Sequence, residues 1–350
     1  MKQRLPVEKF NLPVAKIRSG YYSDSYFVRS KNILEQEHYN PHVVMQVFQR
    51  QHAVLCGIDH AVAILKSCAD HPEELKIRAL FDGDRLNPWD TVLTIEGRLA
   101  DFVHLETVYL GVLSRQTKIA TNVDRVVTAA AGKPVLFFPS RFDHYEVQAE
   151  DGYAAKIGGV FGVSTPANAS YWNGEALGTI PHALIAAYGG NTLAATEAFD
   201  RHIDPAVNRV ALVDFDNDCV RTSLEVARKF GSRLYGVRLD TADTLVDVSV
   251  LPHMGSFKPT GVCPRLVQNV RKALDDEGFT HVQIMVSGGF TAEKIAAFEA
   301  EKTPVNVYAV GASLFNESVN FTADIVSIDG KPCAKLGRQY RENPHLQVVE

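Results

Sequence analysis

Two short apolar segments near the end of the chain each run directly into a turn of small residues. The first ends in Ser287-Gly288-Gly289, and the second ends in Gly311-Ala312-Ser313. A strand that ends in glycine leaves main-chain N–H groups open to an anion, and a following helix adds its positive N-terminal end. Two such turns, one strand–helix unit apart, favour a parallel sheet or barrel whose late loops hold a phosphate group. For either turn alone, a tight loop without a ligand is the competing interpretation.

The same alternation of strands and helices extends back to Pro134, and it is typical of a parallel sheet or an α/β barrel. Short apolar strands are expected at 135–138, 157–161, 209–213, 234–237, 282–286 and 305–310. Helices are expected near 182–188, 192–202, 219–230, 264–277 and 292–301. The pattern therefore predicts one α/β domain over 126–317.

The first part of the chain has a less regular mixture of helix-like and strand-like segments. A helix is expected at 41–50, a strand at 91–95, and one or two helices at 106–131. The tail from Ile325 to Glu350 is too short for a core of its own, so it is expected to pack on this part. We predict a mixed α+β domain over 1–125 that is joined by 318–350.

Composition places the chain among ordinary globular proteins, with 46% hydrophobic residues, 22% charged residues and a formal net charge of -5. Without an excess of basic residues, no nucleic-acid partner is expected. No apolar run is long enough for a signal peptide or a membrane helix, so the expected compartment is the cytoplasm. The five cysteines are scattered without a C-x-x-C pair, which indicates neither a disulfide framework nor a zinc site.

Charged side chains follow the predicted strands at their carboxyl ends, where α/β barrels place their chemistry. They are Arg141, Asp214, Asp216, Asp218, Arg238, Asp240 and Asp243. A helix N-cap is the competing interpretation for Asp218 and Asp243. Carboxylates that face phosphate-binding amides indicate a Mg²⁺–phosphate ligand whose ribose hydroxyls or developing positive charge they contact.

His182 ends the segment Gly178-Thr179-Ile180-Pro181-His182, at the predicted start of a helix for which Thr179 is the candidate cap. A helix N-terminus disfavours the imidazolium and attracts an incoming phosphoryl group, as a phosphate-accepting histidine requires. Capping or packing without chemistry is the competing interpretation for a single histidine. No P-loop or Rossmann glycine motif occurs, and the glycine-rich segment 158–165 lacks the P-loop lysine.

Seven short motifs occur in the order that one enzyme family uses. They are Ser23-Asp24-Ser25-Tyr26, Phe138-x-x-Arg141, Gly178-Thr179-Ile180-Pro181-His182, Val213-Asp214, Arg238-Leu239-Asp240, Ser287-Gly288-Gly289-Phe290 and Val310-Gly311-Ala312-Ser313. With these motifs the chain resembles the nicotinate phosphoribosyltransferases over nearly its whole length. The resemblance is to their shorter bacterial and archaeal branch and, more distantly, to the nicotinamide phosphoribosyltransferases.

The resemblance implies a type II phosphoribosyltransferase fold, an irregular TIM-like α/β barrel with an N-terminal α/β sandwich domain. It also implies a homodimer with shared active sites, and it leaves any higher oligomer open. The family transfers the 5-phosphoribosyl group of 5-phosphoribosyl-1-pyrophosphate (PRPP) to nicotinate, which gives nicotinate mononucleotide and pyrophosphate for NAD salvage. ATP hydrolysis assists the transfer through a phosphorylated histidine, and Mg²⁺ accompanies PRPP and ATP.

By position in these motifs, Phe138 and Tyr26 from the neighbouring subunit would sandwich the pyridine ring, and Arg141 would face its carboxylate. The nicotinamide enzymes carry an aspartate in the loop that matches 162–165, where this sequence has Ser164 and Thr165. An aspartate there would repel the carboxylate of nicotinate, so its replacement by serine favours the acid over the amide as substrate.

The remaining roles concern PRPP and ATP. The resemblance implies that His182 accepts the γ-phosphoryl group of ATP and that Arg238 faces the pyrophosphate. Asp214 and Asp240 would lie near the ribose, and Asp216 is close enough to Asp214 to hold the same role. The 5-phosphate would be held by both glycine turns, that is by Ser287, Gly288, Gly289, Gly311, Ala312 and Ser313.

Three alternatives stay open. The substrate could be nicotinamide or quinolinate, although the second carboxylate of quinolinate demands further cations beside Arg141. A non-catalytic ligand-binding relative would keep the same scaffold. Lys335 and Arg338 could approach a phosphate or could be surface charges. No structural zinc is expected, because the chain lacks the cysteine-rich segment that some relatives carry.

Overall fold

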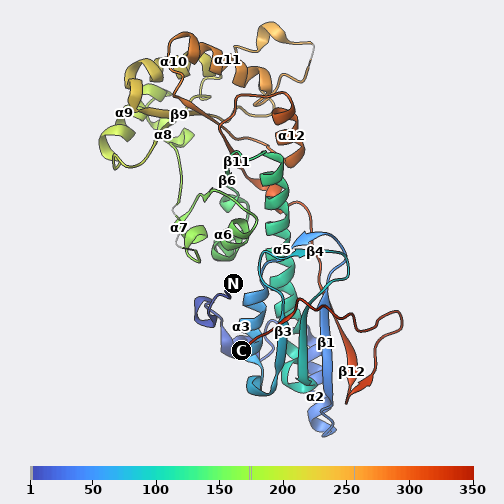
Figure 1. Cartoon of the computed structure of the whole chain (residues 1–350). Helices are drawn as coiled ribbons and strands as arrows, with labels where there is room; N and C mark the ends of the chain where they lie inside the picture. Colours follow the sequence, from blue (N-terminus) through green and yellow to red (C-terminus); the bar gives the residue numbers. More distant parts are fainter. Residues whose placement is uncertain (1–2, 173, 175, 256) are drawn as a thin grey trace. The chain divides into compact units, whose positions relative to one another are not determined.

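The computed structural model of the chain describes residues 3–172, 174, 176–255 and 257–350. It divides into two compact units, each of which is described by itself (Figure 1). One unit comprises Met1–Asn122 with Glu317–Glu350, and the other comprises Val123–Asn316. Among the described residues, none of the helices combines the length and the apolar character that a membrane crossing requires.

A parallel sheet that curves into a half-barrel forms the centre of the unit Val123–Asn316. Its strands, in spatial order, are β7 (Gly162–Val163), β6 (Val135–Phe137), β11 (Val307–Val310), β10 (Gln283–Val286), β9 (Leu234–Leu239) and β8 (Arg209–Leu212). Every neighbouring pair is parallel, so all six carboxyl ends lie at one edge. This edge is where a ligand is expected in such sheets.

Helices alternate with these strands (Figure 1). They are α6 (Gln148–Ile157), α7 (Pro166–Ala169), α8 (His182–Ala187), α9 (Thr192–His202), α10 (Cys219–Phe230), α11 (Pro264–Asp276) and α12 (Ala292–Ala300). In α11 the buried side chains are Leu266, Val267, Val270 and Leu274, which recur at helical spacing and form one apolar stripe. Burial of each such side chain contributes about 1.5–3 kcal/mol, and the helix packs beside α10.

The expected strand at 157–161 is wrong. The apolar residues before it, Tyr153, Ala154 and Ala155, belong to the buried face of α6, which continues to Ile157. The chain then turns through Gly159, whose φ of 101° is left-handed, and only Gly162–Val163 pairs with β6. The short apolar run is thus the end of a helix followed by a turn. Apolar character alone does not distinguish these two features from a strand.

An antiparallel sheet organises the other unit. Its spatial order is β13 (Lys331–Pro332), β12 (Thr322–Ile328), β1 (His42–Phe48), β5 (Thr91–Arg98), β3 (Lys76–Ala79) and β14 (Gln347–Val348). Figure 1 shows β12, from the end of the chain, beside β1 from its first part, and residues 322–328 pair with residues 43–48. The tail therefore completes this sheet at both edges.

Helices accompany this sheet, among them α2 (Ser25–Gln36), α3 (Ile58–Cys68) and α5 (Glu106–Ala129). The core includes Val43, Leu65, Ile95, Tyr109 and Phe321, from the sheet, α3, α5 and the C-terminal segment. The strand expected at 91–95 and the helix expected at 106–131 are confirmed as β5 and α5.

The helix expected at 41–50 is wrong, because this segment forms β1. Its β-branched residues Val43, Val44 and Val47 suit a strand, and β1 has a ladder partner on each side. Pairing with β12 and β5 satisfies its backbone groups, so tertiary contacts decide a segment whose apolar spacing also fits a helix.

Candidate active site

A cavity of about 580 Å³ lies at the carboxyl ends of the parallel strands. Its walls come from the loops after β6, β7, β9, β10 and β11, from the end of β8, and from the start of α8. The site therefore occupies the edge of the sheet where parallel strands bring their following loops together.

Twelve of the residues expected to bind substrate or to act on it line this one cavity. They are Phe138, Arg141, Ser164, His182, Arg238, Asp240, Ser287, Gly288, Gly289, Gly311, Ala312 and Ser313. Three expected residues are not in the cavity wall. Asp214 forms a hydrogen bond with His182, and Thr165 donates one to the buried Asn168. Tyr26 is in the other unit, where 58% of its surface is exposed.

His182 and Asp214 form a hydrogen-bonded pair beside the cavity, with 3.0 Å between Nε2 of the ring and Oδ2 of the carboxylate. The His182 side chain is 45% exposed, whereas the Asp214 side chain is only 6% exposed. Burial is the largest influence on the Asp214 carboxyl and raises its pKa, the nearby His182 opposes this shift, and Asp240 adds to it. Because a carboxylate accepts hydrogen bonds, Nε2 carries the proton, and in the neutral ring Nδ1 is left with the lone pair.

The structure distinguishes Asp214 from Asp216. Asp216 pairs with Arg221 and accepts a hydrogen bond from Thr222 at 3.2 Å, so it faces α10. Asp218 caps the same helix by accepting from the backbone N–H of Arg221. Only Asp214 of the three contacts His182.

Arg238 is the centre of a polar network on the floor of the cavity. Its guanidinium donates to Ser287 Oγ at 2.8 Å, to Thr179 Oγ1 at 3.2 Å and to Asp240 Oδ2 at 3.3 Å. Ser287 in turn donates to Asp240 Oδ1 at 2.6 Å. The guanidinium plane is thus held by three partners, which fixes its direction before any ligand arrives.

Two expectations about side chains change with this network. Thr179 does not cap α8, because its hydroxyl accepts from Arg238 and donates to the carbonyl of Ile180, and Pro181 occupies the N-cap position. Ser287 is buried, and its hydroxyl bonds to Arg238 and Asp240. An anion at this turn would therefore be bound by the backbone amides of the glycines and not by the serine side chain.

The two glycine turns lie side by side because β10 and β11 are neighbours. Gly288 and Gly289 both have left-handed φ values, 86° and 66°, which turn consecutive backbone amides toward one side. Ser313 of the second turn donates to the carbonyl of Phe290 in the first at 2.7 Å, which ties the turns together.

Sequence reasoning missed Lys294 on α12. Its Nζ lies 3.4 Å from the carbonyl oxygen of Gly288 and 4.3 Å from the centre of the Phe290 ring. Burial lowers the pKa of this ammonium. The sequence does contain a signal for Lys294, because this residue follows Thr291 by three positions. Thr291 caps α12, and the cap places Lys294 in the first helical turn, next to the glycine loop.

Aromatic and hydroxyl groups line the opposite end of the cavity. The Arg238 guanidinium lies 5.6 Å from the centre of the Phe138 ring, and the exposed Arg141 lies 5.2 Å from that of Phe142. Ser164 Oγ is 2.9 Å from the hydroxyl of Ser140, a residue that sequence reasoning did not select. A flat ring can stack on Phe138 with Arg141 available to an anionic substituent.

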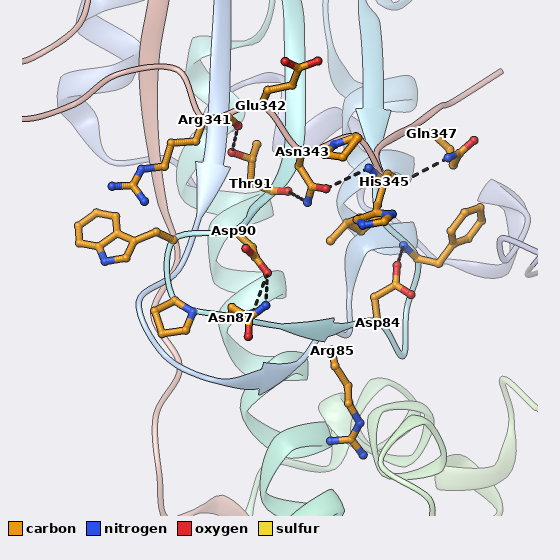
Figure 2. Close-up of a pocket in the computed structure, with 15 residues that line it drawn as sticks. Asp84, Arg85, Asn87, Asp90, Thr91, Arg341, Glu342, Asn343, His345 and Gln347 are labelled. Atoms are coloured by element: carbon orange, nitrogen blue, oxygen red, sulfur yellow. Dashed lines mark hydrogen bonds between the residues drawn. The ribbon is translucent and has the colours of Figure 1, made fainter.

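A larger cavity, of about 960 Å³, lies within the unit that carries the antiparallel sheet (Figure 2). Its polar groups largely satisfy one another, since Asp90 accepts from Asn87, and Asn343 donates to the carbonyl of Thr91. Thr91 donates to the carbonyl of Arg341 at 2.6 Å. None of the residues expected to act on substrate lines it, so size does not identify the reactive site here.

Within the part of the chain that the structure describes, no group of three or more His, Cys, Asp or Glu side chains could hold a metal ion. Asp214 has one buried carboxylate oxygen, Oδ1, without a hydrogen-bond partner among the described residues. Together with Asp240 it could face a divalent cation that arrives with a phosphate ligand, because hard cations prefer such oxygens.

Residues 24–117 match the family described as quinolinate phosphoribosyl transferase, N-terminal domain. A curated relative, nicotinate phosphoribosyltransferase pncB1 of Mycobacterium tuberculosis, is 30% identical over 271 residues, which cover 75% of this chain and 56% of the relative. The chain thus spans little more than half the length of this relative.

Solved structures are similar as well. A nicotinate-nucleotide pyrophosphorylase from Pyrococcus furiosus is 32% identical with a TM-score of 0.82, and the match covers 100% of this chain and 86% of that one. Human nicotinic acid phosphoribosyltransferase is 18% identical with a TM-score of 0.68, and the match covers 91% of this chain and 77% of that one. The expected fold class, a type II barrel with an N-terminal α/β domain, is confirmed.

Proposed function

Because the chain belongs to the nicotinate phosphoribosyltransferase family, we propose that it makes nicotinate mononucleotide and pyrophosphate from nicotinate and PRPP, with assistance from ATP. The single observation that carries the proposal is that His182, oriented by Asp214, lines one cavity with the Arg238 network and the two glycine turns. An acyl or hydride transfer would not need this combination of an oriented imidazole with two anion-binding loops.

In the ATP-dependent step, Nδ1 of His182 is the nucleophile. Its lone pair forms a bond to the γ-phosphorus of ATP while the bond from that phosphorus to the bridging oxygen breaks, and ADP leaves. Asp214 accepts the Nε2–H hydrogen bond and balances the positive charge that the ring gains. Water later cleaves the P–N bond and releases inorganic phosphate.

In the transfer step, the pyridine nitrogen of nicotinate forms a bond to C1 of the ribose as the bond from C1 to the pyrophosphate oxygen breaks. Positive charge develops on the ribose, and Asp240 in the cavity wall stabilises it. Arg238 faces the departing pyrophosphate, while the amides of Gly288 and Gly289 hold the 5-phosphate. Mg²⁺ that accompanies PRPP would neutralise part of the leaving-group charge, and Asp214 and Asp240 are the carboxylates that could face it.

Quinolinate is the second candidate substrate, since the matching N-terminal family and the name of the Pyrococcus furiosus relative are compatible with it. A second carboxylate needs a second cation. Besides His182, the described cavity wall offers Arg141 and Arg238, and Arg238 is already paired with Asp240. Arg141 is then the guanidinium in this wall that is left for a carboxylate, which favours nicotinate, with its single carboxylate, over quinolinate.

We further propose a homodimer that shares its active sites. One short stretch of the chain carries several large exposed apolar side chains, which suit an interface. They are Tyr21, Tyr22, Tyr26, Ile33 and Tyr39. Tyr26 would then stack on the pyridine held in the other subunit's cavity.

We propose the cytoplasm as the compartment. All five cysteines are free thiols, which is the state expected in a reducing compartment.

The test uses the purified full chain with PRPP, Mg²⁺ and one pyridine at a time, with and without ATP. We expect nicotinate mononucleotide and pyrophosphate, with a higher yield when ATP is present. Quinolinate turnover would release carbon dioxide as well, which identifies the second candidate. If high enzyme concentrations give no product with nicotinate, nicotinamide or quinolinate, the proposal fails.

A further inference from the structure

The turn that carries Asp214 lies between β8 and α10, at residues 213–218. Asn217 donates its backbone N–H to the carbonyl of Asp214 at 3.1 Å, which closes the turn. Its φ of 61° is left-handed, a conformation that asparagine adopts more readily than most residues. The place of the Asp214 carboxylate therefore depends on what holds Asn217.

Two hydrogen bonds tie Asn217 to the loop between β9 and α11. Its Nδ2 donates to the carbonyl of Val246 at 2.7 Å, and the backbone N–H of Val248 donates to the carbonyl of Asn217 at 3.0 Å. Because β8 and β9 are neighbouring parallel strands, their following loops meet at the same edge of the sheet. The Asp214 turn is thus held by a loop that follows a different strand.

Asp247, between these two contacts, ties the same loop to the start of α10. This residue is fully buried. Its Oδ2 accepts from the backbone N–H of Cys219, the first residue of α10, at 2.9 Å. Its Oδ1 accepts from the backbone N–H and the hydroxyl of Ser249, at 2.9 and 2.7 Å. The carboxylate thus joins the two loops on the far side of the turn from Asp214.

Regular secondary structure supports this arrangement, because Asn269 of α11 donates to the carbonyl of Ser249 at 2.9 Å. Asp216 and Asp218 bond instead to α10, the helix that follows the turn, so they hold the turn locally. The contacts of Asn217 and Asp247 are different, since they relate the turn to the sheet edge that carries the cavity.

We propose that Asn217 and Asp247 are positioning residues for the phosphoryl transfer to His182. They hold the turn where the Asp214 carboxylate meets Nε2 of the ring, at 3.0 Å. The inference rests on the proposed function, and the bonds that form and break are those of its ATP-dependent step. Neither residue exchanges a proton with ATP, so each acts through Asp214. A displacement of about 1 Å at a reacting centre can cost about 10²-fold in rate.

Asp247→Asn tests the proposal without a change of side-chain shape. Both carboxylate oxygens face backbone N–H groups, so the NH₂ group of asparagine meets a donor in either orientation. We expect stimulation by ATP, and acid-labile labelling by its γ-phosphoryl group, to fall by about ten- to 10²-fold. Transfer without ATP should keep its rate.

The matched control is Asp59→Asn. Asp59 is also buried, at 3% exposure, and it accepts from the distant backbone N–H of Leu5 at 2.8 Å, but it belongs to the other unit. This variant should lose stability, as Asp247→Asn does, without any loss of stimulation by ATP.

Asn217→Gly is a milder second variant, which decides the matter if Asp247→Asn does not fold. Glycine keeps the left-handed turn and removes the bond to Val246. Loss of one hydrogen bond should lower the labelling rate about two- to tenfold. Combined with Asp214→Asn, it should lower that rate no further than Asp214→Asn alone, because both changes act on one interaction.

Three results would overturn the inference while the wild type still responds to ATP and the proposed function stands. They are unchanged labelling in Asn217→Gly, multiplied losses in its combination with Asp214→Asn, and a loss of stimulation in Asp59→Asn equal to that in Asp247→Asn. If the wild type makes no nicotinate mononucleotide, or makes it without any response to ATP, the proposed function itself fails, and the inference fails with it.

Discussion

Nε2 of His182 lies 3.0 Å from Oδ2 of Asp214, and in the neutral ring this contact leaves the free lone pair on Nδ1. The exposed ring and the buried carboxylate resemble a nucleophile–orienter pair, in which the second residue selects the tautomer of the first. A phosphoryl group taken from ATP is therefore expected on Nδ1.

Replacement of Asp214 by Asn tests this tautomer. The amide keeps the shape but can donate to Nε2, which would move the ring proton to Nδ1 and remove the nucleophile. We expect stimulation by ATP to fall by roughly 10²-fold or more, while transfer without ATP is retained. His182→Ala should show the same two effects. The measurement is initial rate with and without ATP, together with acid-labile incorporation of the γ-phosphoryl group into protein. Undiminished labelling of Asp214→Asn would contradict the assigned tautomer.

Gly288→Ala tests the phosphate cradle. The φ of 86° strains any other residue, and the new Cβ would lie 3.4 Å from Oδ1 of Asp240, next to the expected 5-phosphate. We expect KM for PRPP to rise about tenfold or more, as for loss of roughly one charged hydrogen bond, with KM for nicotinate little changed.

The matched control for this change is Gly278→Ala. Gly278 has a similar φ of 83°, and a Cβ there meets nothing within 4 Å. Both variants should lose about 1–3 kcal/mol of stability from backbone strain, whereas only Gly288→Ala should change the PRPP KM. Equal kinetic effects in the two variants would remove the cradle from the interpretation.

The sequence located the strand ends and the glycine turns well because both are local signals. Apolar runs followed by Gly288-Gly289 or Gly311 report a strand, its end and a backbone conformation within a few residues. The segment that forms β1 carries no such local signal, since its partner β12 comes from the other end of the chain. Pairing between distant segments decides its conformation, and a short sequence window does not contain that information.

The polar interior of the site was harder to predict for the same reason. Ser140 donates to Oδ1 of Asn168, whose position depends on the contact between α6 and α7 at Gly152. Thr179 illustrates the reverse case, in which a residue with good capping chemistry is taken by a distant side chain, Arg238. Residue types suggested the chemistry, whereas packing decided which hydroxyl bonds to which partner.

Arg238→Lys tests the fixed guanidinium. Lysine carries the same charge, but its single ammonium cannot reproduce the planar set of bonds to Ser287, Thr179 and Asp240. We expect kcat/KM for PRPP to fall by about 10²–10³-fold, the usual effect of removing one oriented donor at developing negative charge.

Arg228→Lys is the control for that exchange. Arg228 also makes a two-pronged pair, with Glu277, but it lies on the exposed face of α10. Its variant should retain normal kinetics, because exposed pairs contribute little to stability and this one is remote from the cavity. If Arg238→Lys behaved like Arg228→Lys, orientation of the guanidinium would not matter for the reaction.

Glu106, the first residue of α5, should make stability depend on pH near neutrality. Burial, followed by the charges of Asp324 and Asp24, raises the pKa of its carboxyl to about 7. The folded state therefore holds a proton that the unfolded chain releases at lower pH. The stabilising effect of that proton is complete below pH 4.5 and is lost as pH rises through 7.

Glu106→Gln tests this dependence because the glutamine side chain stays neutral. We expect the free energy of unfolding, measured by urea titration, to change less between pH 5 and 8 than in the wild type. Glu277→Gln is the control, because Arg228 lowers the pKa of Glu277 and its titration lies below this window. An unchanged slope in Glu106→Gln would assign the pH dependence to another group.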